Sequence, residues 1–148
     1  MTKKTLAYMI LMVVMLSSAT AFSADEAYIV LPEIPRISVE ELKGMIDDGE
    51  DVVTVDVRDS HSYRVGRIKG SVNIYYDSAA DPMHRQLIMM ALPTDRLIVF
   101  YCDCTDDASS AYMAHELHKL GYDRDKAKVL RGGSLRWVEL DYPLTSSD

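Results

Sequence analysis

The residues most able to do chemistry are Cys102 and Cys104, the only cysteines in the 148-residue sequence. Their types allow a nucleophile, a small disulfide or a pair of metal ligands. In an extended segment their Cα atoms would lie about 6.6 Å apart, near the upper limit for a disulfide. A bridge would therefore need a local bend, and so short a loop would constrain the unfolded chain little. The spacing favours reactive chemistry over a structural cross-link.

The two cysteines fall between a predicted strand, residues 96–102, and a predicted helix that starts near Ala108 and ends at Gly121. Backbone N–H groups and the helix dipole favour an anion at such a strand-to-helix turn. A thiol there should have a lowered pKa and be a thiolate near neutral pH. The loop contains no glycine, so a phosphate-binding P-loop is not indicated.

The remaining pattern indicates a parallel α/β sheet. The other predicted elements are a helix after the capping box 38–41, a buried strand 51–57, a polar loop 58–70, a short strand 71–76, a helix 81–92, a strand 126–130, a tight turn 131–133 and a short helix 134–140. The strands are apolar throughout and alternate with helices, which is typical of a sheet covered on both faces. Catalytic groups in such sheets lie at the carboxyl ends of strands, where the cysteines fall.

Three stretches, in order, resemble a rhodanese-like domain. Residues 52–74 are similar to that family's Asp-Val-Arg…Gly-His-Ile-x-Gly-Ala-x-Asn pattern, with Arg67 in place of the histidine and Ser71 in place of the alanine. The strand with its cysteine loop is the second match. Residues 129–144 are similar to the closing Leu-x-Gly-Gly-x-x-x-Trp followed by proline. The resemblance spans about residues 37–144 and implies a three-layer fold, a central parallel sheet with helices on both faces.

The resemblance also implies a sulfurtransferase. In that mechanism a thiolate attacks a small sulfane-sulfur donor or a persulfidated protein, holds the outer sulfur as a persulfide, and passes it to a thiol or cyanide-like acceptor. It implies no cofactor and no metal.

The family pattern fits either cysteine. A cysteine that directly follows a tyrosine at the strand end corresponds to Cys102, whereas Cys-x-x-Gly-x-Arg-Ser, counted back from the helix at Ser110, places the nucleophile on Cys104. A subgroup with Tyr-Cys-x-Cys and an acidic loop is similar to this sequence. We favour Cys104, with Cys102 as the alternative or as a resolving partner. The expected substrate loop comprises Asp103, Thr105, Asp106, Asp107, Ala108, Ser109 and Ser110.

The loop departs from the family where it would bind an anionic donor. Asp106, Asp107 and Ser109 replace the familiar glycine and arginine region. Carboxylates beside a thiolate raise its pKa and repel thiosulfate, so we predict weak activity with thiosulfate and a preference for a polysulfide, persulfide or protein donor. Alternatively, the acids simply stabilise the first helical turn. Arg58 and Arg67 are candidate anion-binding residues, although Arg58 is better interpreted as a structural ion-pair residue.

Other functions stay open at this point. The cysteine pair could cycle through a disulfide in a thiol-redox protein, or the domain could be a catalytically silent binding module, as the missing loop arginine suggests. A metal site made by both cysteines with His115 and His118 is a weaker alternative, because the spacing is not a standard zinc pattern. Trp137 is expected to be a core residue.

The first residues predict export. Lys3 and Lys4 precede an apolar run, residues 6–16, and then small residues, as in a secretory signal peptide; the run is shorter than the roughly 20 residues that span a bilayer. An uncleaved anchor is the alternative. The predicted segments are a signal peptide 1–23, an N-terminal arm 24–36, the domain 37–144 and a tail 145–148. We therefore expect a bacterial periplasmic or secreted protein with no stable membrane anchor after cleavage. The net charge of −7 and the lack of a basic stripe argue against a nucleic-acid partner.

Overall fold

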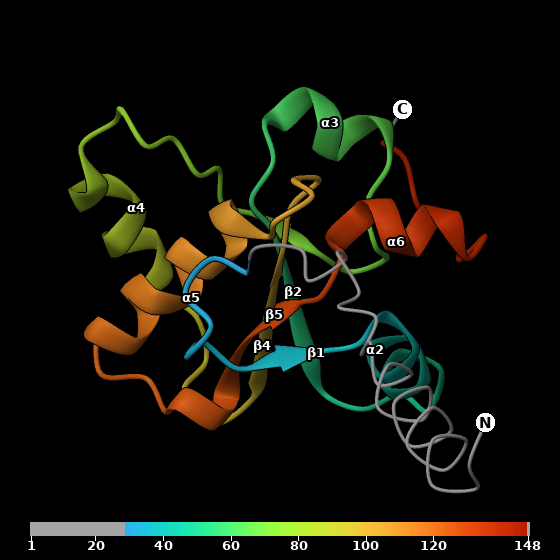
Figure 1. The fold of residues 1–148 in the computed structure, drawn as a ribbon, viewed down its shortest axis with the longest axis horizontal. Helices are drawn as coiled ribbons and strands as arrows, with labels where there is room; N and C mark the ends of the chain where they lie inside the picture. The colour runs from blue at the N-terminus through green and yellow to red at the C-terminus, as the bar shows by residue number, and fades with distance from the viewer. Residues whose placement is uncertain (1–28, 148) are drawn as a thin grey trace, which may run out of the picture.

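The computed structural model describes residues 29–147, so the predicted signal peptide lies outside the described residues. The centre is a five-stranded parallel sheet in the order β1-β5-β4-β2-β3 (Figure 1). Its strands are β1 (Arg36–Ile37), β2 (Val52–Asp56), β3 (Val72–Asn73), β4 (Leu97–Tyr101) and β5 (Ala127–Leu130). The predicted parallel α/β fold is confirmed.

Helices cover the sheet on both faces. They are α2 (Val39–Asp47), α3 (Ser60–Val65), α4 (Pro82–Met89), α5 (Ala108–Lys119) and α6 (Gly133–Glu139), with a short 3-10 helix η1 (Arg124–Lys126). In Figure 1, α4 and α5 lie on one side of the sheet and α2 and α6 on the other. Two buried apolar clusters match this division, one including α4 and α5 residues, the other including α2 and α6 residues. The three-layer arrangement is therefore also confirmed.

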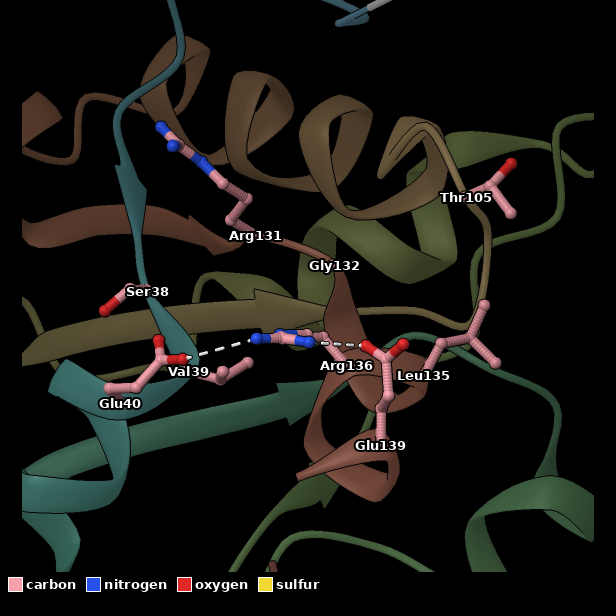
Figure 2. A pocket seen from close by; sticks show the side chains of 9 residues that line it. All are labelled: Ser38, Val39, Glu40, Thr105, Arg131, Gly132, Leu135, Arg136 and Glu139. Atoms are coloured by element: carbon pink, nitrogen blue, oxygen red, sulfur yellow. Dashed lines mark hydrogen bonds and ion pairs between the residues drawn. The ribbon is translucent and has the colours of Figure 1, made fainter. Parts of the chain in front are cut away.

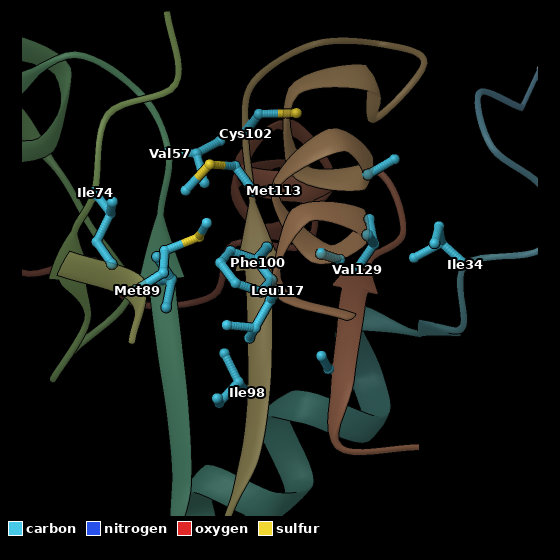
Figure 3. Packing of buried hydrophobic residues seen from close by; sticks show 14 residues of the cluster. Ile34, Val57, Ile74, Met89, Ile98, Phe100, Cys102, Met113, Leu117 and Val129 are labelled. Carbon is cyan, nitrogen blue, oxygen red and sulfur yellow. The ribbon is translucent and has the colours of Figure 1, made fainter. Parts of the chain in front are cut away.

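Strand β4 contributes side chains to both clusters. Ile98 and Phe100 belong to the cluster under α4 and α5, which Figure 3 shows, whereas Val99 and Tyr101 belong to the other. All four side chains are fully buried, which explains why the strand is apolar at every position. Cys102 continues the alternation into the α5 side and is buried with that cluster.

Two segments differ from the sequence-based prediction. The region 58–70, predicted as a polar loop, contains α3, whose N-terminus is capped by the Asp59 carboxylate, which accepts from His61 N and Ser62 N. No residue of α3 is buried, so this helix has no apolar periodicity to detect. Strand β1 lies at the end of the predicted arm and pairs with β5. Within residues 29–147 no helix is long and apolar enough to cross a membrane.

Candidate active site

The cysteine loop, residues 102–107, joins the end of β4 to the start of α5. A disulfide connects Cys102 and Cys104, with their Cα atoms 5.6 Å apart. The spacing argument disfavoured a cross-link, but the chain bends at Asp103, and the bend brings the two Cα atoms closer than an extended chain would. Cys102 is only 2% exposed, whereas Cys104 is partly exposed at the edge of the core. The two sulfurs therefore differ in their access to solvent.

The first turn of α5 holds the loop in place. The Ser110 hydroxyl lies 3.1 Å from Cys102 Sγ and 3.2 Å from the Asp107 carbonyl oxygen, and it can donate its single proton to either. The Asp106 carboxylate accepts from Ala108 N at 3.1 Å. Asp106, which precedes the N-cap residue Asp107, therefore satisfies one N–H group at the start of α5, in keeping with the alternative that the loop acids stabilise the helix.

Backbone conformation relates the loop to the family pattern. Asp107 has φ +56°, the left-handed region that favours glycine. It lies three residues after Cys104, where the pattern Cys-x-x-Gly has its glycine, and Ser110 then takes the place of the pattern's serine. This observation supports the register that makes Cys104 the nucleophile, and the choice between the two cysteines stays a prediction.

The turn between β5 and α6 packs directly on the cysteine backbone. Ser134 N donates to the Cys102 carbonyl oxygen at 2.8 Å, and the Ser134 hydroxyl lies 3.2 Å from the same oxygen. Gly133 has φ +50°, and a Cβ added there would overlap the Cys102 carbonyl. Only glycine therefore fits where the two segments meet. The tight turn predicted at 131–133 occupies residues 131–132, and Gly133 already begins α6. Its contact with the cysteine is not visible in the sequence.

The Asp107 carboxylate makes a second link between the same two segments. It accepts from Gly132 N at 3.1 and 3.3 Å and is 7% exposed. Burial raises the pKa of the Asp107 carboxyl above its ordinary value, while the Gly132 hydrogen bond and the charges of Arg36 and Arg131 act in the opposite direction. These two arginines, which sequence reasoning missed, therefore partly compensate the negative charge of the loop. The available signal was the position of Arg131 directly after β5.

The two candidate anion-binding arginines are engaged elsewhere. The Arg58 guanidinium donates to both oxygens of the buried Asp56 carboxylate at 2.6–3.2 Å and to the Gly66 carbonyl oxygen at 2.6 Å. The interpretation of Arg58 as a structural ion-pair residue agrees with this geometry. Arg67 lies over the Tyr63 ring, 4.6 Å from its centre.

A surface pocket of about 530 Å³ opens beside the cysteine loop (Figure 2). Thr105 brings the loop to its rim, and Arg131, which Figure 2 also labels, lies at the end of β5. Arg136 forms ion pairs with Glu139 at 2.7 Å and Glu40 at 3.9 Å. The other lining residues are Ser38, Val39, Gly132 and Leu135. Thr105 is the residue of the cysteine loop that lines the pocket, one position after Cys104.

The remaining predicted residues are spread over the surface and the core. Asp103 and Thr105 are exposed, and Ala108 and Ser109 are partly buried. Trp137 is buried, as expected, and its Nε1 donates to the Pro143 carbonyl oxygen. In the described part of the chain no three His, Cys, Asp or Glu side chains are grouped so that they could hold a metal ion. His118 Nε2 lies 3.0 Å from the Ala127 carbonyl oxygen.

Comparison with known proteins places the chain in a family. A protein named sulfurtransferase from Allochromatium vinosum is 30% identical over 116 residues, which is 78% of this chain and 98% of the relative. An uncharacterised 16.5 kDa protein from Synechococcus elongatus is 37% identical over 70 residues, and the match spans only about half, 47%, of either protein. The crystal structure of the BH2092 protein from Bacillus halodurans has the same fold, with a TM-score of 0.64, 19% identity and coverage of 97% of this chain and 86% of that one. The family model of the rhodanese-like domain matches residues 38–140, and the chain therefore belongs to the rhodanese-like domain family.

Proposed function

We propose that the chain is a sulfurtransferase that takes up sulfane sulfur on Cys104 as a persulfide and passes it to a thiophilic acceptor. The observation that carries the proposal is that Cys104 is both partly exposed and at the position of the cysteine in the family pattern. Cys104 is the more accessible sulfur, and the left-handed Asp107 lies three residues beyond it. The relative from Allochromatium vinosum, named a sulfurtransferase, supports the reaction class.

The reaction starts from the reduced protein, because a disulfide leaves no thiolate to attack. The Cys104 thiolate attacks the outer sulfur of the donor, the bond to that sulfur breaks, and the rest of the donor leaves with the electron pair. An acceptor thiolate or cyanide then attacks the outer sulfur of the persulfide and regenerates the Cys104 thiolate. The chain's own part is to hold this thiolate in the loop that leads into the N-terminus of α5, where the helix dipole favours an anion.

The charges around the loop support a donor other than thiosulfate. Asp103 and Asp106 lie in the loop, and Arg58 is engaged with Asp56. Arg131 and Arg136 line the pocket, but Arg136 is paired with two glutamates. The proposed donor class is a polysulfide, a low-molecular-weight persulfide or a persulfidated protein, with a thiol or cyanide-like acceptor. The charge argument favours the persulfidated protein most, because a polysulfide is itself an anion.

Thiocyanate formation from cyanide tests the proposal. With reduced protein, polysulfide as donor and cyanide in excess, wild type and Cys102→Ser should form thiocyanate faster than the direct reaction of cyanide with polysulfide, and Cys104→Ser should not exceed that background rate. Thiosulfate should support much slower turnover than polysulfide. Inactivity of all three proteins with every donor would support the silent binding module, and activity that depends on Cys102 rather than Cys104 would reverse the assignment of the nucleophile.

We also propose that the protein is exported and that its signal peptide is cleaved after Ala21-Phe22-Ser23, before Ala24. Cleavage after Ala19-Thr20-Ala21 is the second option. The support is the basic start, the apolar run and the small residues of the first segment. N-terminal sequencing of the protein recovered from a periplasmic or culture fraction of a bacterial host should begin at Ala24. Full-length protein retained in the membrane fraction would favour the uncleaved anchor.

A further inference from the structure

The disulfide shows that the two sulfurs of the cysteine loop can reach each other without leaving the fold. Cys102 belongs to the buried cluster, in contact with α5 residues, and Cys104 lies at the partly exposed edge of the same cluster. A bulky donor can therefore reach Cys104, while Cys104 is the cysteine that the Cys102 thiol can attack. This division of access has a chemical consequence once a persulfide forms.

We infer that Cys102 resolves the Cys104 persulfide and releases its outer sulfur as hydrogen sulfide, so that the protein is also a sulfane-sulfur reductase. The inference rests on the proposed persulfide at Cys104. It differs from transfer to an acceptor, because the sulfur leaves reduced and the enzyme is left oxidised.

The step balances within the chain. The Cys102 thiolate attacks Cys104 Sγ, the inner sulfur of the persulfide, and forms the Cys102–Cys104 bond seen in the structure. The bond between Cys104 Sγ and the outer sulfur breaks, and the outer sulfur leaves with the electron pair as HS⁻, taking its proton from the persulfide or from water. The two cysteine sulfurs are oxidised together by two electrons, and the sulfane sulfur is reduced by two. A further turnover needs a dithiol reductant, which converts the disulfide back to two thiols.

Local contacts support the ionised form of Cys102. Burial alone raises the pKa of a cysteine thiol and would keep it inert. Here the Ser110 hydroxyl lies 3.1 Å from Cys102 Sγ and can turn from the Asp107 carbonyl oxygen to donate to a thiolate. The Cys102 carbonyl oxygen is held by Ser134, so the backbone of the attacking residue is fixed as well. Cys102 is therefore held for attack on its neighbour, which is the role of a resolving cysteine.

A single-turnover experiment without added thiol tests the step. Fully reduced wild type, Cys102→Ser, Cys102→Ala and Cys104→Ser are mixed anaerobically with a small excess of sodium tetrasulfide, and both sulfide and intact mass are followed. Beyond the sulfide released by the Cys102→Ser sample, wild type should give one sulfide per chain and end with a mass loss of two hydrogens. Both Cys102 variants should instead hold a mass gain of one sulfur, and they should release this sulfur as sulfide, above the background, only after a thiol is added. Cys104→Ser should do neither.

Ser110→Ala tests the role of the Ser110 hydroxyl through the pH profile of sulfide release, which a purely structural effect would not change. Because a hydrogen bond to a charged group contributes about 1.5–3 kcal/mol, loss of the Ser110 donor should slow sulfide release roughly tenfold or more. It should also move the pH profile of release to higher pH. Persulfide formation at Cys104 should be little changed in the same variant.

The outcomes separate this step from the proposed function. If no variant takes up sulfur, the persulfide itself is wrong and both proposals fail. If the Cys102 variants and wild type all hold a stable persulfide and release no extra sulfide, transfer survives and resolution by Cys102 is overturned. Equal sulfide release by wild type and Cys102→Ala would overturn it as well.

Discussion

Replacement of Gly133 by alanine should break the contact that ties the β5–α6 turn to the cysteine loop. Gly133 has φ +50°, and an added Cβ would overlap the Cys102 carbonyl, the same oxygen that accepts from Ser134 N. The added Cβ is fixed to the Gly133 backbone, and the atoms that it meets belong to the Cys102 backbone. A change of side-chain rotamer therefore cannot relieve the overlap. We therefore expect the turn to move away from Cys102 and the hydrogen bond from Ser134 to be lost.

The size of the effect follows from two contributions. A non-glycine residue in the left-handed region costs roughly 1–2 kcal/mol. Loss of a buried backbone hydrogen bond leaves an unsatisfied group that costs about 1–3 kcal/mol. Gly133→Ala should therefore lower the free energy of unfolding by roughly 3 kcal/mol in total, before any residual steric strain.

Gly49→Ala is the matched control. Gly49 also has a positive φ, +72°, but a Cβ there would meet no atom within 4 Å. This variant should show only the backbone contribution, roughly 1–2 kcal/mol. Urea unfolding of the reduced proteins, with the slope of the transition unchanged, gives the difference between the two variants. Equal destabilisation by Gly133→Ala and Gly49→Ala would refute the claim that the turn packs against the cysteine backbone.

Three further predictions concern the loop and its surroundings. Arg58→Met leaves the Asp56 carboxylate buried without its partner and should lower the free energy of unfolding by about 3–5 kcal/mol. Arg96→Met, at an exposed ion pair, should change the free energy of unfolding by less than about 1 kcal/mol. Similar values for the two variants in denaturant unfolding would contradict the structural role of Arg58. Since burial raises the pKa of Asp107, the wild-type protein should lose stability as pH rises from the ordinary carboxyl pKa through the raised one, and Asp107→Asn should not. If the wild type instead gained stability relative to Asp107→Asn over that pH interval, the result would contradict the buried carboxyl. In the reduced protein iodoacetamide should alkylate Cys104 faster than Cys102, which is 2% exposed, and peptide mapping that finds the reverse order would contradict the difference in access.

The main elements of the fold follow from local sequence patterns, because the residues that form them also bury them. Strand β4 is apolar at every position, since Phe100 and Tyr101 enter opposite cores, and the pattern therefore predicts it well. The helix after the cysteines is predicted for the same reason, through Ala114 and Leu117 at helical spacing. Helix α3 buries no residue and rests on the Asp59 cap, so its polar sequence resembles a loop.

The candidate site is less predictable, because its geometry depends on contacts between distant segments. The motif places Cys102 and Cys104 on one loop, but the contact of Ser134 with the Cys102 carbonyl joins residues 32 positions apart. The hydrogen bond from Gly132 N to the Asp107 carboxylate likewise joins residues 25 positions apart. Sequence reasoning placed this acid near the thiolate, whereas in the structure its carboxylate is bound to a backbone N–H group. The short-range disulfide was disfavoured because the bend at Asp103 is a property of the folded loop and not of the spacing.

Location of the donor sulfur by peptide mass spectrometry tests the central claim most directly. Reduced Cys102→Ser and Cys104→Ser are treated with polysulfide, freed of excess donor and digested without reductant. The account predicts a gain of one sulfur on the peptide that carries Cys104 in the first variant and no gain in the second. A persulfide on Cys102 in Cys104→Ser, together with none on Cys104 in Cys102→Ser, would contradict it.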